Sequence, residues 1–214
     1  MIIIKNDKEI DLMRIAGRIV AETLLLVEKE VRPGITTAEL DRIAEEFITK
    51  HGAIPSFKGL YGFPASLCIS VNEQVVHGIP GGYVLKEGDI ISVDCGAHIN
   101  GFHGDAARTF AVGDISEQAN KLIKVTEESF FKGLEFAKVG NRLTDISHEI
   151  QRYVEASGFS VVRDFVGHGI GRSVHEDPEV PNFGRPGRGP KLVAGMTLAI
   201  EPMVNMGTYR VATL

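Results

Sequence analysis

Gly88-Asp-Ile-Ile-Ser-Val-Asp94 and Gly195-Met-Thr-Leu-Ala-Ile-Glu201 follow one pattern: a glycine, an apolar run suited to a buried strand, and a carboxylate six residues after the glycine. A carboxylate at the end of a buried strand must be paired, protonated or bound to a cation, because burying it alone is costly. The two copies stand 107 residues apart. The repeat predicts a cation site to which two related halves of the chain both contribute.

Two further pairs of glycines support a duplication of the chain. Gly34 and Gly140 are 106 residues apart, and so are Gly52 and Gly158. The repeated strand pattern and these two glycine pairs are thus separated by nearly the same number of residues and occur in the same order in both halves. Such a constant separation is typical of an internal repeat. We therefore expect a single domain over residues 1–214, made of half-domains at about 1–115 and 116–214.

Hydrophobic periodicity predicts a pair of helices in each half, followed by strands. The helices are expected at residues 6–31, 36–51, 116–137 and 144–157, and the strands at residues 65–71, 89–97, 102–112, 160–165 and 196–204. Residues 53–66 are expected to form a loop. Helix pairs followed by strands indicate an α+β fold, in which helices cover one face of a largely antiparallel sheet.

The strands at 89–97 and 102–112 are expected to form a hairpin that carries two carboxylates. A four-residue turn would place Asp94 directly opposite Asp105, whereas a two-residue Asn100-Gly101 turn would place them diagonally, on one face in both cases. The alternatives to a metal site are that both carboxylates are solvated beside a turn, or that one pairs with Arg108. The apolar strand before Asp94 favours the metal site.

The second half offers further ligand types, each with a plainer alternative. His168 lies between glycines and is either a metal ligand or a histidine of a flexible loop. His175 is either functional or a surface histidine of an acidic loop. His77, taken alone, is more often structural than catalytic. Glu201 is harder to dismiss, because it follows an apolar strand and precedes a proline that ends the ladder.

Composition excludes several classes of protein. Apolar residues make up 43% of the 214 residues and charged residues 24%, as in a soluble globular protein. The net charge is -5 and no long basic run occurs, so binding to nucleic acid is not expected. Two cysteines suit a reducing compartment, and no apolar stretch of 18 residues indicates a membrane span. We expect a cytoplasmic protein.

Six motifs together give the chain a family resemblance. They are Val76-His77-Gly-Ile-Pro80, Ser92-Val-Asp94-Cys-Gly96, Gly101-Phe-His-Gly-Asp105, Gly167-His168-Gly-Ile-Gly171, His175-Glu-Asp-Pro178 and Ala199-Ile-Glu201-Pro-Met203. In the order and spacing of these motifs, from about residue 2 to about residue 210, the chain resembles the type I methionine aminopeptidases of bacteria.

This resemblance implies the pseudo-twofold pita-bread fold and a site for two divalent ions of cobalt, manganese or iron. Asp94 would chelate one ion, Asp105 would bridge both, and His168 and Glu201 would bind the other. The fifth ligand of the family, a glutamate in a Tyr/Phe-Glu-His-Thr strand, has no counterpart in these 214 residues. We therefore expect that the C-terminal hairpin strand is missing, that the second metal site is impaired, and that this chain has weak or no peptidase activity.

The resemblance also implies the reaction, in which a metal-bound hydroxide attacks the first peptide bond of a chain that begins with methionine. Glu201 would transfer the proton, His175 would stabilise the oxyanion, and His77 would hydrogen-bond the substrate amide. The methionine side chain would enter a pocket formed by Phe57, Leu60, Phe63, Cys68 and Val174.

The expected substrates are the N-termini of nascent proteins. The ribosome is a candidate partner, a monomer is expected, and neither nucleic acid nor a membrane is expected as a partner. The alternative function is a non-catalytic pita-bread binding module that keeps the fold without metal competence.

Overall fold

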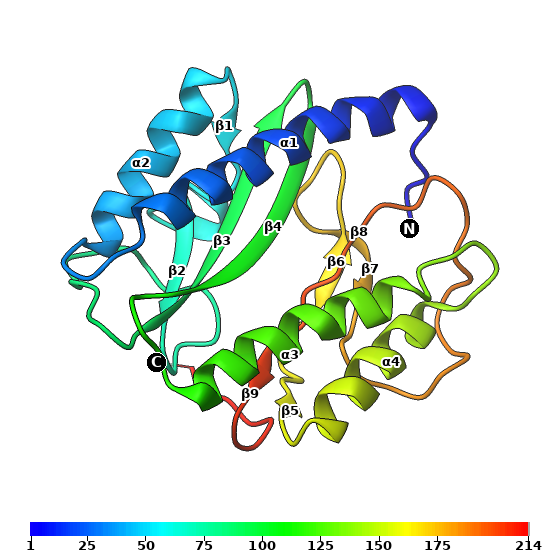
Figure 1. Ribbon diagram of the computed structural model, residues 1–214. Coiled ribbons are helices and arrows are strands. Elements are labelled where there is room, and N and C mark those ends of the chain that lie inside the picture. Colours follow the sequence, from blue (N-terminus) through cyan, green and yellow to red (C-terminus); the bar gives the residue numbers. More distant parts are fainter. Residues whose placement is uncertain (214) are drawn as a thin grey trace. The chain divides into compact units, whose positions relative to one another are not determined.

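The computed structural model describes residues 1–213, whose elements are labelled in Figure 1. The helices are α1 Asp7–Glu30, α2 Thr37–Lys50, α3 Glu117–Leu134 and α4 Leu143–Ala156, with a 3-10 turn at Leu60–Gly62. The strands are β1 Ile54–Pro55, β2 Leu67–Val71, β3 Ile90–Ile99, β4 Phe102–Ala111, β5 Ser160–Val161, β6 Gly167–Gly169, β7 Glu176–Val180, β8 Leu198–Ala199 and β9 Val204–Asn205. All four helices expected from the sequence are present.

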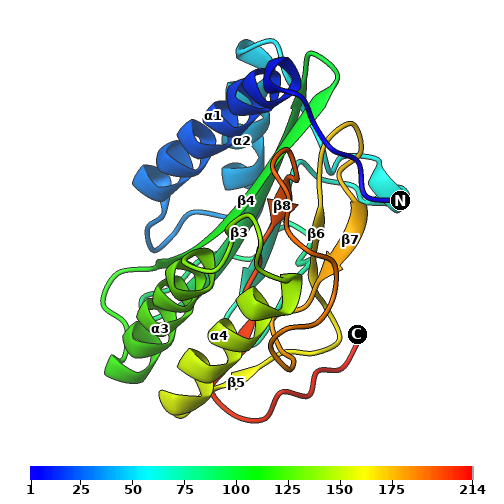
Figure 2. The ribbon, with the colours of Figure 1, turned by 90° about the vertical axis from the view of Figure 1, so that its right-hand side faces the viewer.

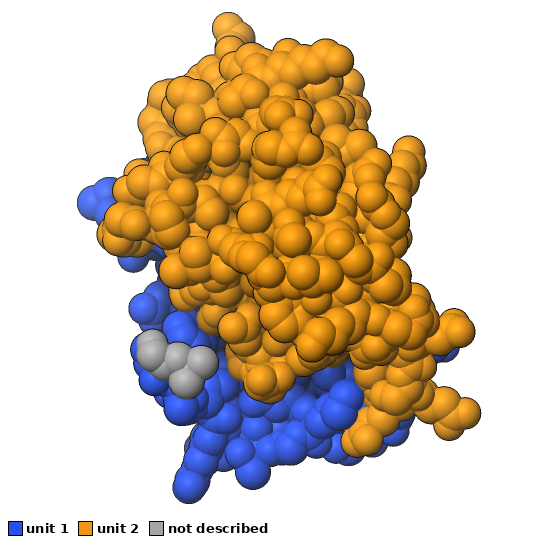
Figure 3. All heavy atoms as spheres, turned by 90° about the vertical axis from the view of Figure 1, so that its left-hand side faces the viewer, with its two compact units in different colours: residues 1–6, 120–170, 175–214 blue, residues 7–119, 171–174 orange. Residues whose placement is uncertain are grey.

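The chain divides into two compact units, which Figure 3 draws in different colours. Unit 1 contains residues 1–6, 120–170 and 175–214, and unit 2 contains residues 7–119 and 171–174. The chain therefore passes from one unit to the other more than once. Among residues 1–213, no helix has both the length and the apolar character that a membrane span requires.

Unit 2 is a four-stranded antiparallel sheet with two helices packed on it. β3 pairs with β1, β2 and β4, and α1 packs against β3 and β4 while α2 packs against β1 and β2 (Figures 1 and 2). The approach of α1 is close, because a Cβ added at Gly104 of β4 would lie 2.7 Å from the backbone nitrogen of Gly17. Leu24, Leu40 and Ile91 are fully buried between helices and sheet.

The hairpin of β3 and β4 turns through two residues. Asn100 and Gly101 both have positive φ, at 54° and 79°, which is the geometry of a type I′ turn. The register pairs Gly96 with Asp105 and Asp94 with Ala107. Of the two turns considered from the sequence, the two-residue turn is correct, and the two carboxylates are diagonal neighbours on one face of the hairpin.

Unit 1 has its own core beneath α3 and α4, which lie side by side in Figures 1 and 2. A Cβ at Gly133 of α3 would lie 2.7 Å from the side chain of Ile150, so glycine allows the two helices to approach. β6 pairs with β7 and β8, and β5 pairs with β9, all antiparallel.

The repeat predicted from the sequence is present in the local backbone. α2 and α4 each contain 14 residues, and the turn before each is fastened by equivalent hydrogen bonds, from Gly34 N to Leu85 O and from Gly140 N to Leu192 O. The three predicted glycine pairs share a left-handed conformation, with φ of 91° and 100° at Gly34 and Gly140, 74° and 87° at Gly52 and Gly158, and 91° and 88° at Gly88 and Gly195.

The strands of unit 1 differ from the prediction. The predicted strand at 160–165 is only β5, and the one at 196–204 is interrupted, because β8 pairs with β6 whereas β9 pairs with β5. Pro202 has no N–H to continue a ladder, and Glu201 lies at this break. β6 and β7 were not predicted, and β1 lies inside the expected loop at 53–66.

Candidate metal centre and substrate pocket

His168 lies on β6, between two glycines that the packing requires. A Cβ at Gly167 would lie 2.2 Å from Ala199 O, and a Cβ at Gly169 would lie 2.1 Å from Asp177 O. The glycines therefore let the backbone of β6 fit between its two neighbouring strands. This placement in a paired strand argues against the alternative of a histidine in a flexible loop.

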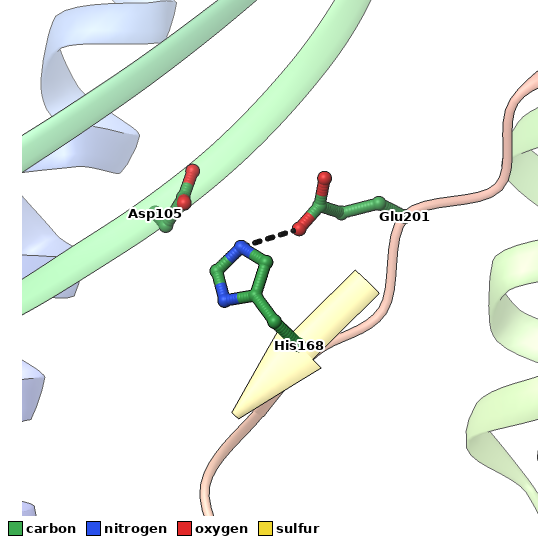
Figure 4. Close-up of side chains that lie close together, drawn as sticks. All are labelled: Asp105, His168 and Glu201. Atoms are coloured by element: carbon green, nitrogen blue, oxygen red, sulfur yellow. Dashed lines mark ion pairs between the residues drawn. The ribbon is translucent and has the colours of Figure 1, made fainter. Parts of the chain in front are cut away.

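His168 and Glu201 lie close together within unit 1. Nδ1 of His168 lies 2.8 Å from Gly169 O, and because a carbonyl can only accept, Nδ1 carries a hydrogen. Nε2 lies 3.1 Å from Oε1 of Glu201, a pair that Figure 4 marks with a dashed line. That Oε1 is buried and has no hydrogen-bond partner among the described residues. An imidazole nitrogen and a carboxylate oxygen are both ligand types of divalent metals, so this pair of neighbouring groups is suited to such an ion.

Asn182 fixes the backbone at Glu201 and was not singled out from the sequence. Its side chain is fully buried, and Nδ2 donates to Glu201 O at 2.7 Å. The bond spans 19 residues, so only the folded structure reveals it. It fastens the break between β8 and β9 from which Glu201 projects.

His175 lies immediately before β7 in the same unit. Its ring meets that of His168 edge to face, with centroids 4.5 Å apart. The next residue, Glu176, forms an ion pair with Lys5 at 2.5 Å, and both side chains are almost completely buried. Breaking a buried ion pair by removing one partner is strongly destabilising, so the start of β7 is firmly held.

The two aspartates of unit 2 lie on the central hairpin. Asp94 is opposite Cys68 of β2 on one side and Ala107 of β4 on the other, and Asp105, labelled on β4 in Figure 4, is opposite Gly96. Side chains alternate along a strand, so Arg108 projects from the face opposite to Asp105. The alternative in which Arg108 neutralises these carboxylates is therefore not favoured. Asp105, His168 and Glu201 each offer an atom that ligates divalent metals.

His77 is held in an unusual backbone conformation beside β2. Its φ is 60°, a left-handed value that is uncommon for a residue other than glycine. The segment packs closely against β2: the carbonyl of Gly78 accepts from Ile69 N at 2.8 Å. Only a glycine fits here, since a Cβ at Gly78 would lie 2.2 Å from Ile69 O. The histidine itself is exposed.

The five residues expected to form a methionine pocket pack together in unit 2. Phe57, Cys68 and Val174 are buried, and Leu60 and Phe63 pack against them. Burial raises the pKa of the Cys68 thiol far above its usual range, so this side chain is a neutral, apolar wall residue. That these residues receive methionine stays a prediction.

Comparison with known proteins identifies the family. The sequence model of metallopeptidase family M24 matches residues 11–212. The chain belongs to this family. Among curated M24 relatives, the methionine aminopeptidase of Clostridium perfringens is 79% identical over 214 residues, covering all of this chain and 86% of the relative. Methionine aminopeptidase 1 of Bacillus subtilis is 60% identical over the same coverage.

Solved M24 structures give the same result for the fold. The methionine aminopeptidase of Thermotoga maritima superposes with a TM-score of 0.98 at 49% identity, covering all of this chain and 86% of that one. The enzyme of Rickettsia prowazekii gives 0.97 at 43% identity, covering 98% and 85%. The predicted family resemblance and α+β pita-bread fold are confirmed, and the alternative of a non-catalytic module is not favoured by membership of this hydrolase family.

Proposed function

We propose that the chain is a metal-dependent methionine aminopeptidase, which removes the initiator methionine from nascent proteins. The observation that carries this proposal is the 79% identity to a methionine aminopeptidase over all 214 residues. The orientation of His168 toward a buried oxygen of Glu201 supports the metal dependence.

The proposed ligands are Asp94, Asp105, His168 and Glu201, which would hold two divalent ions of cobalt, manganese or iron. When bound, such ions supply Lewis-acid activation of the scissile carbonyl and of a water molecule. We propose that one ion binds tightly and that the second binds more weakly.

The proposed roles of the other groups follow from the bonds that change. The oxygen of water bonds to the carbonyl carbon, the C–N bond breaks, and the amine that leaves takes up a proton. Glu201 accepts the proton of the attacking water on a carboxylate oxygen and passes it to that amine. His175 donates a hydrogen bond to the oxyanion, and His77 hydrogen-bonds the substrate amide nitrogen.

The methionine side chain is proposed to enter the pocket of Phe57, Leu60, Phe63, Cys68 and Val174. A thioether is soft and polarisable, and it packs well against aromatic and apolar walls. Nascent chains in the cytoplasm would be the substrates of a monomer, with the ribosome as a candidate partner. The acidic net charge of -5 supports a protein that does not bind nucleic acid.

The test is release of methionine from a Met-Ala-Ser peptide with added manganese or cobalt. Methionine release, which is expected to be weak, should require added metal, disappear with a chelator, and be lost in His168→Gln, while the control variant His148→Gln keeps it. His148 lies on α4, its Nδ1 bonds to Gly184 O, and it has no proposed role. A folded wild-type chain that neither binds manganese or cobalt nor releases methionine would favour the non-catalytic module.

Calorimetric titration with manganese tests the metal stoichiometry separately. We expect one tight and one weak site. Two equally tight sites per chain would contradict the impaired second site and leave the enzymatic proposal intact.

A further inference from the structure

We propose that Asp41 and Glu45 of α2 are positioning residues, which hold the methionine pocket in shape by fixing both ends of the loop at 56–67. This inference rests on the proposed function, because it assigns the loop to substrate binding. The loop carries three of the five pocket residues, namely Phe57, Leu60 and Phe63. Neither carboxylate has a part in the proposed chemistry.

Asp41 fixes the end of the loop that enters β2. One oxygen, Oδ1, accepts from Ser66 N at 2.9 Å and from Leu67 N at 2.7 Å. Ser66 is fully buried, and buried backbone N–H groups that lose their acceptor are costly. The carboxylate of Asp41 therefore decides where the loop joins the sheet.

Glu45 joins this end of the loop to its beginning. Its Oε2 accepts from Ser66 Oγ at 3.0 Å, and its Oε1 accepts from Lys58 Nζ at 2.6 Å. Lys58 directly follows the pocket residue Phe57. One glutamate thus restrains both sides of the segment that carries Leu60 and Phe63.

The spacing of the two carboxylates along α2 explains how they cooperate. Residues four apart lie on the same face of a helix, so Asp41 and Glu45 reach the loop together. Desolvation by burial raises the pKa of Asp41, whereas the hydrogen bond from Lys58 lowers the pKa of Glu45. Asp41 is held by directed N–H donors, and Glu45 by a charged partner.

The loop between these anchors has a backbone that needs external support. Gly59, Tyr61 and Gly62 have φ of 86°, 51° and 83°, and a left-handed conformation is strained for a tyrosine. Within the loop, backbone bonds such as Gly59 N to Phe63 O at 2.8 Å are short-range, and its first residue, Ser56, donates its backbone N–H to Gly96 O at 2.9 Å. Without Asp41 and Glu45, we expect Phe57, Leu60 and Phe63 to lose their fixed positions.

Asp41→Ala and Asp41→Asn form a matched pair of variants. Both bonds end on one oxygen, so asparagine can supply the same acceptor, whereas alanine cannot. We expect Asp41→Ala to raise KM for a Met-Ala-Ser peptide about tenfold, which corresponds to about 1.4 kcal/mol, with kcat within about twofold. Asp41→Asn should keep the wild-type KM. An unchanged KM in Asp41→Ala, or a fall in kcat alone, would overturn the proposal.

A second pair of variants tests the other anchor, whose side chains are partly exposed. Lys58→Met should raise KM in the same direction, and Lys58→Arg should restore it. These surface changes keep the test decisive if Asp41→Ala does not fold. If Asp41 and Lys58 only stabilised the fold, the variants would have a lower melting temperature but would not show a raised KM with an unchanged kcat.

Hydrogen exchange of the free protein tests the anchoring of the loop by Asp41 and Glu45 independently of enzymatic activity. Amides at 57–63 should exchange faster in Asp41→Ala than in Asp41→Asn or wild type. If exchange at these amides is unchanged in Asp41→Ala, Asp41 does not anchor the loop, whatever the activity. If exchange is faster in Asp41→Ala but the wild-type protein releases no methionine, the anchoring of the loop is supported and the enzymatic assignment is wrong.

Discussion

Gly96 gives the sharpest quantitative test of the pocket. It lies on β3 beneath the loop that carries Phe57, and a Cβ at this position would lie 2.7 Å from Ser56 Cβ and 2.8 Å from Phe57 Cε1. Carbon atoms in contact normally sit about 3.5–4.0 Å apart. In Gly96→Ala the loop or the ring must therefore move by roughly 1 Å, and overpacking of this kind costs about 1–3 kcal/mol.

This cost is measurable as a loss of thermal stability. For a chain of this size each kcal/mol lowers the melting temperature by about 2–4 °C, so we expect a fall of about 2–12 °C. Gly82→Ala is the matched control, because it has no atom within 4 Å of the added Cβ and no positive φ. It should change stability by no more than about 0.5 kcal/mol.

A double-mutant cycle with Phe57→Ala identifies the group that clashes. If the ring is the obstacle, the penalty of Gly96→Ala should shrink in the Phe57→Ala background, because the two residues are in contact. The same penalty in both backgrounds, or no penalty in the single variant, would refute the reasoning.

Three further predictions concern the site and its supports. Asp105→Asn should abolish methionine release and weaken manganese binding in a calorimetric titration. Lys5→Met should destabilise the protein by about 3–5 kcal/mol in urea unfolding, since it removes the cation that pairs with the buried carboxylate of Glu176. Hydrogen bonds from the backbone N–H groups of Arg142 and Gly187 lower the pKa of Asp145. The stability this adds is present above the unfolded pKa of about 3.9 and is lost as pH falls through the folded value, so Asp145→Asn should flatten the acid side of the stability curve.

Each of these predictions has its own control. Asp11→Asn, an exposed change on α1, should leave metal binding intact, and full turnover by Asp105→Asn would remove that aspartate from the ligand set. Lys5→Met combined with Glu176→Met should recover much of the lost stability, and a double variant as unstable as the single one would contradict the ion-pair argument. For Asp145, acid unfolding curves that run parallel in variant and wild type would show that its hydrogen bonds do not matter.

Local chemistry explains what the sequence could predict. The Asn100-Gly101 turn and the start of α2 were both predictable from short-range signals: Thr36 caps the helix through a bond from Glu39 N to its Oγ1 at 3.1 Å. The glycine pairs were visible because a left-handed backbone restricts the residue type at those positions. The face shared by Asp94 and Asp105 followed from the alternation of side chains along strands.

The remaining features depend on contacts between distant residues. The three residues of β6 are a strand only because two other segments pair with them, and the apolar run before Glu201 is divided because its two ends pair with different partners. The roles of Asn182 and Asp41 likewise depend on bonds across 19 and 25 residues. A window as short as a strand or a helical turn does not contain both partners of such a bond.

The attachment of Lys5 has a consequence for the order in which the chain can fold as it is synthesised. Its amide donates to Gly195 O at 2.8 Å, and its side chain pairs with Glu176. Residues 7–119 carry nearly all of unit 2 and emerge early, so that unit can assemble while the rest is still being made. Residues 1–6 must wait until Glu176 and Gly195 have been made, so they reach their native place after residues 7–119, which follow them in the sequence.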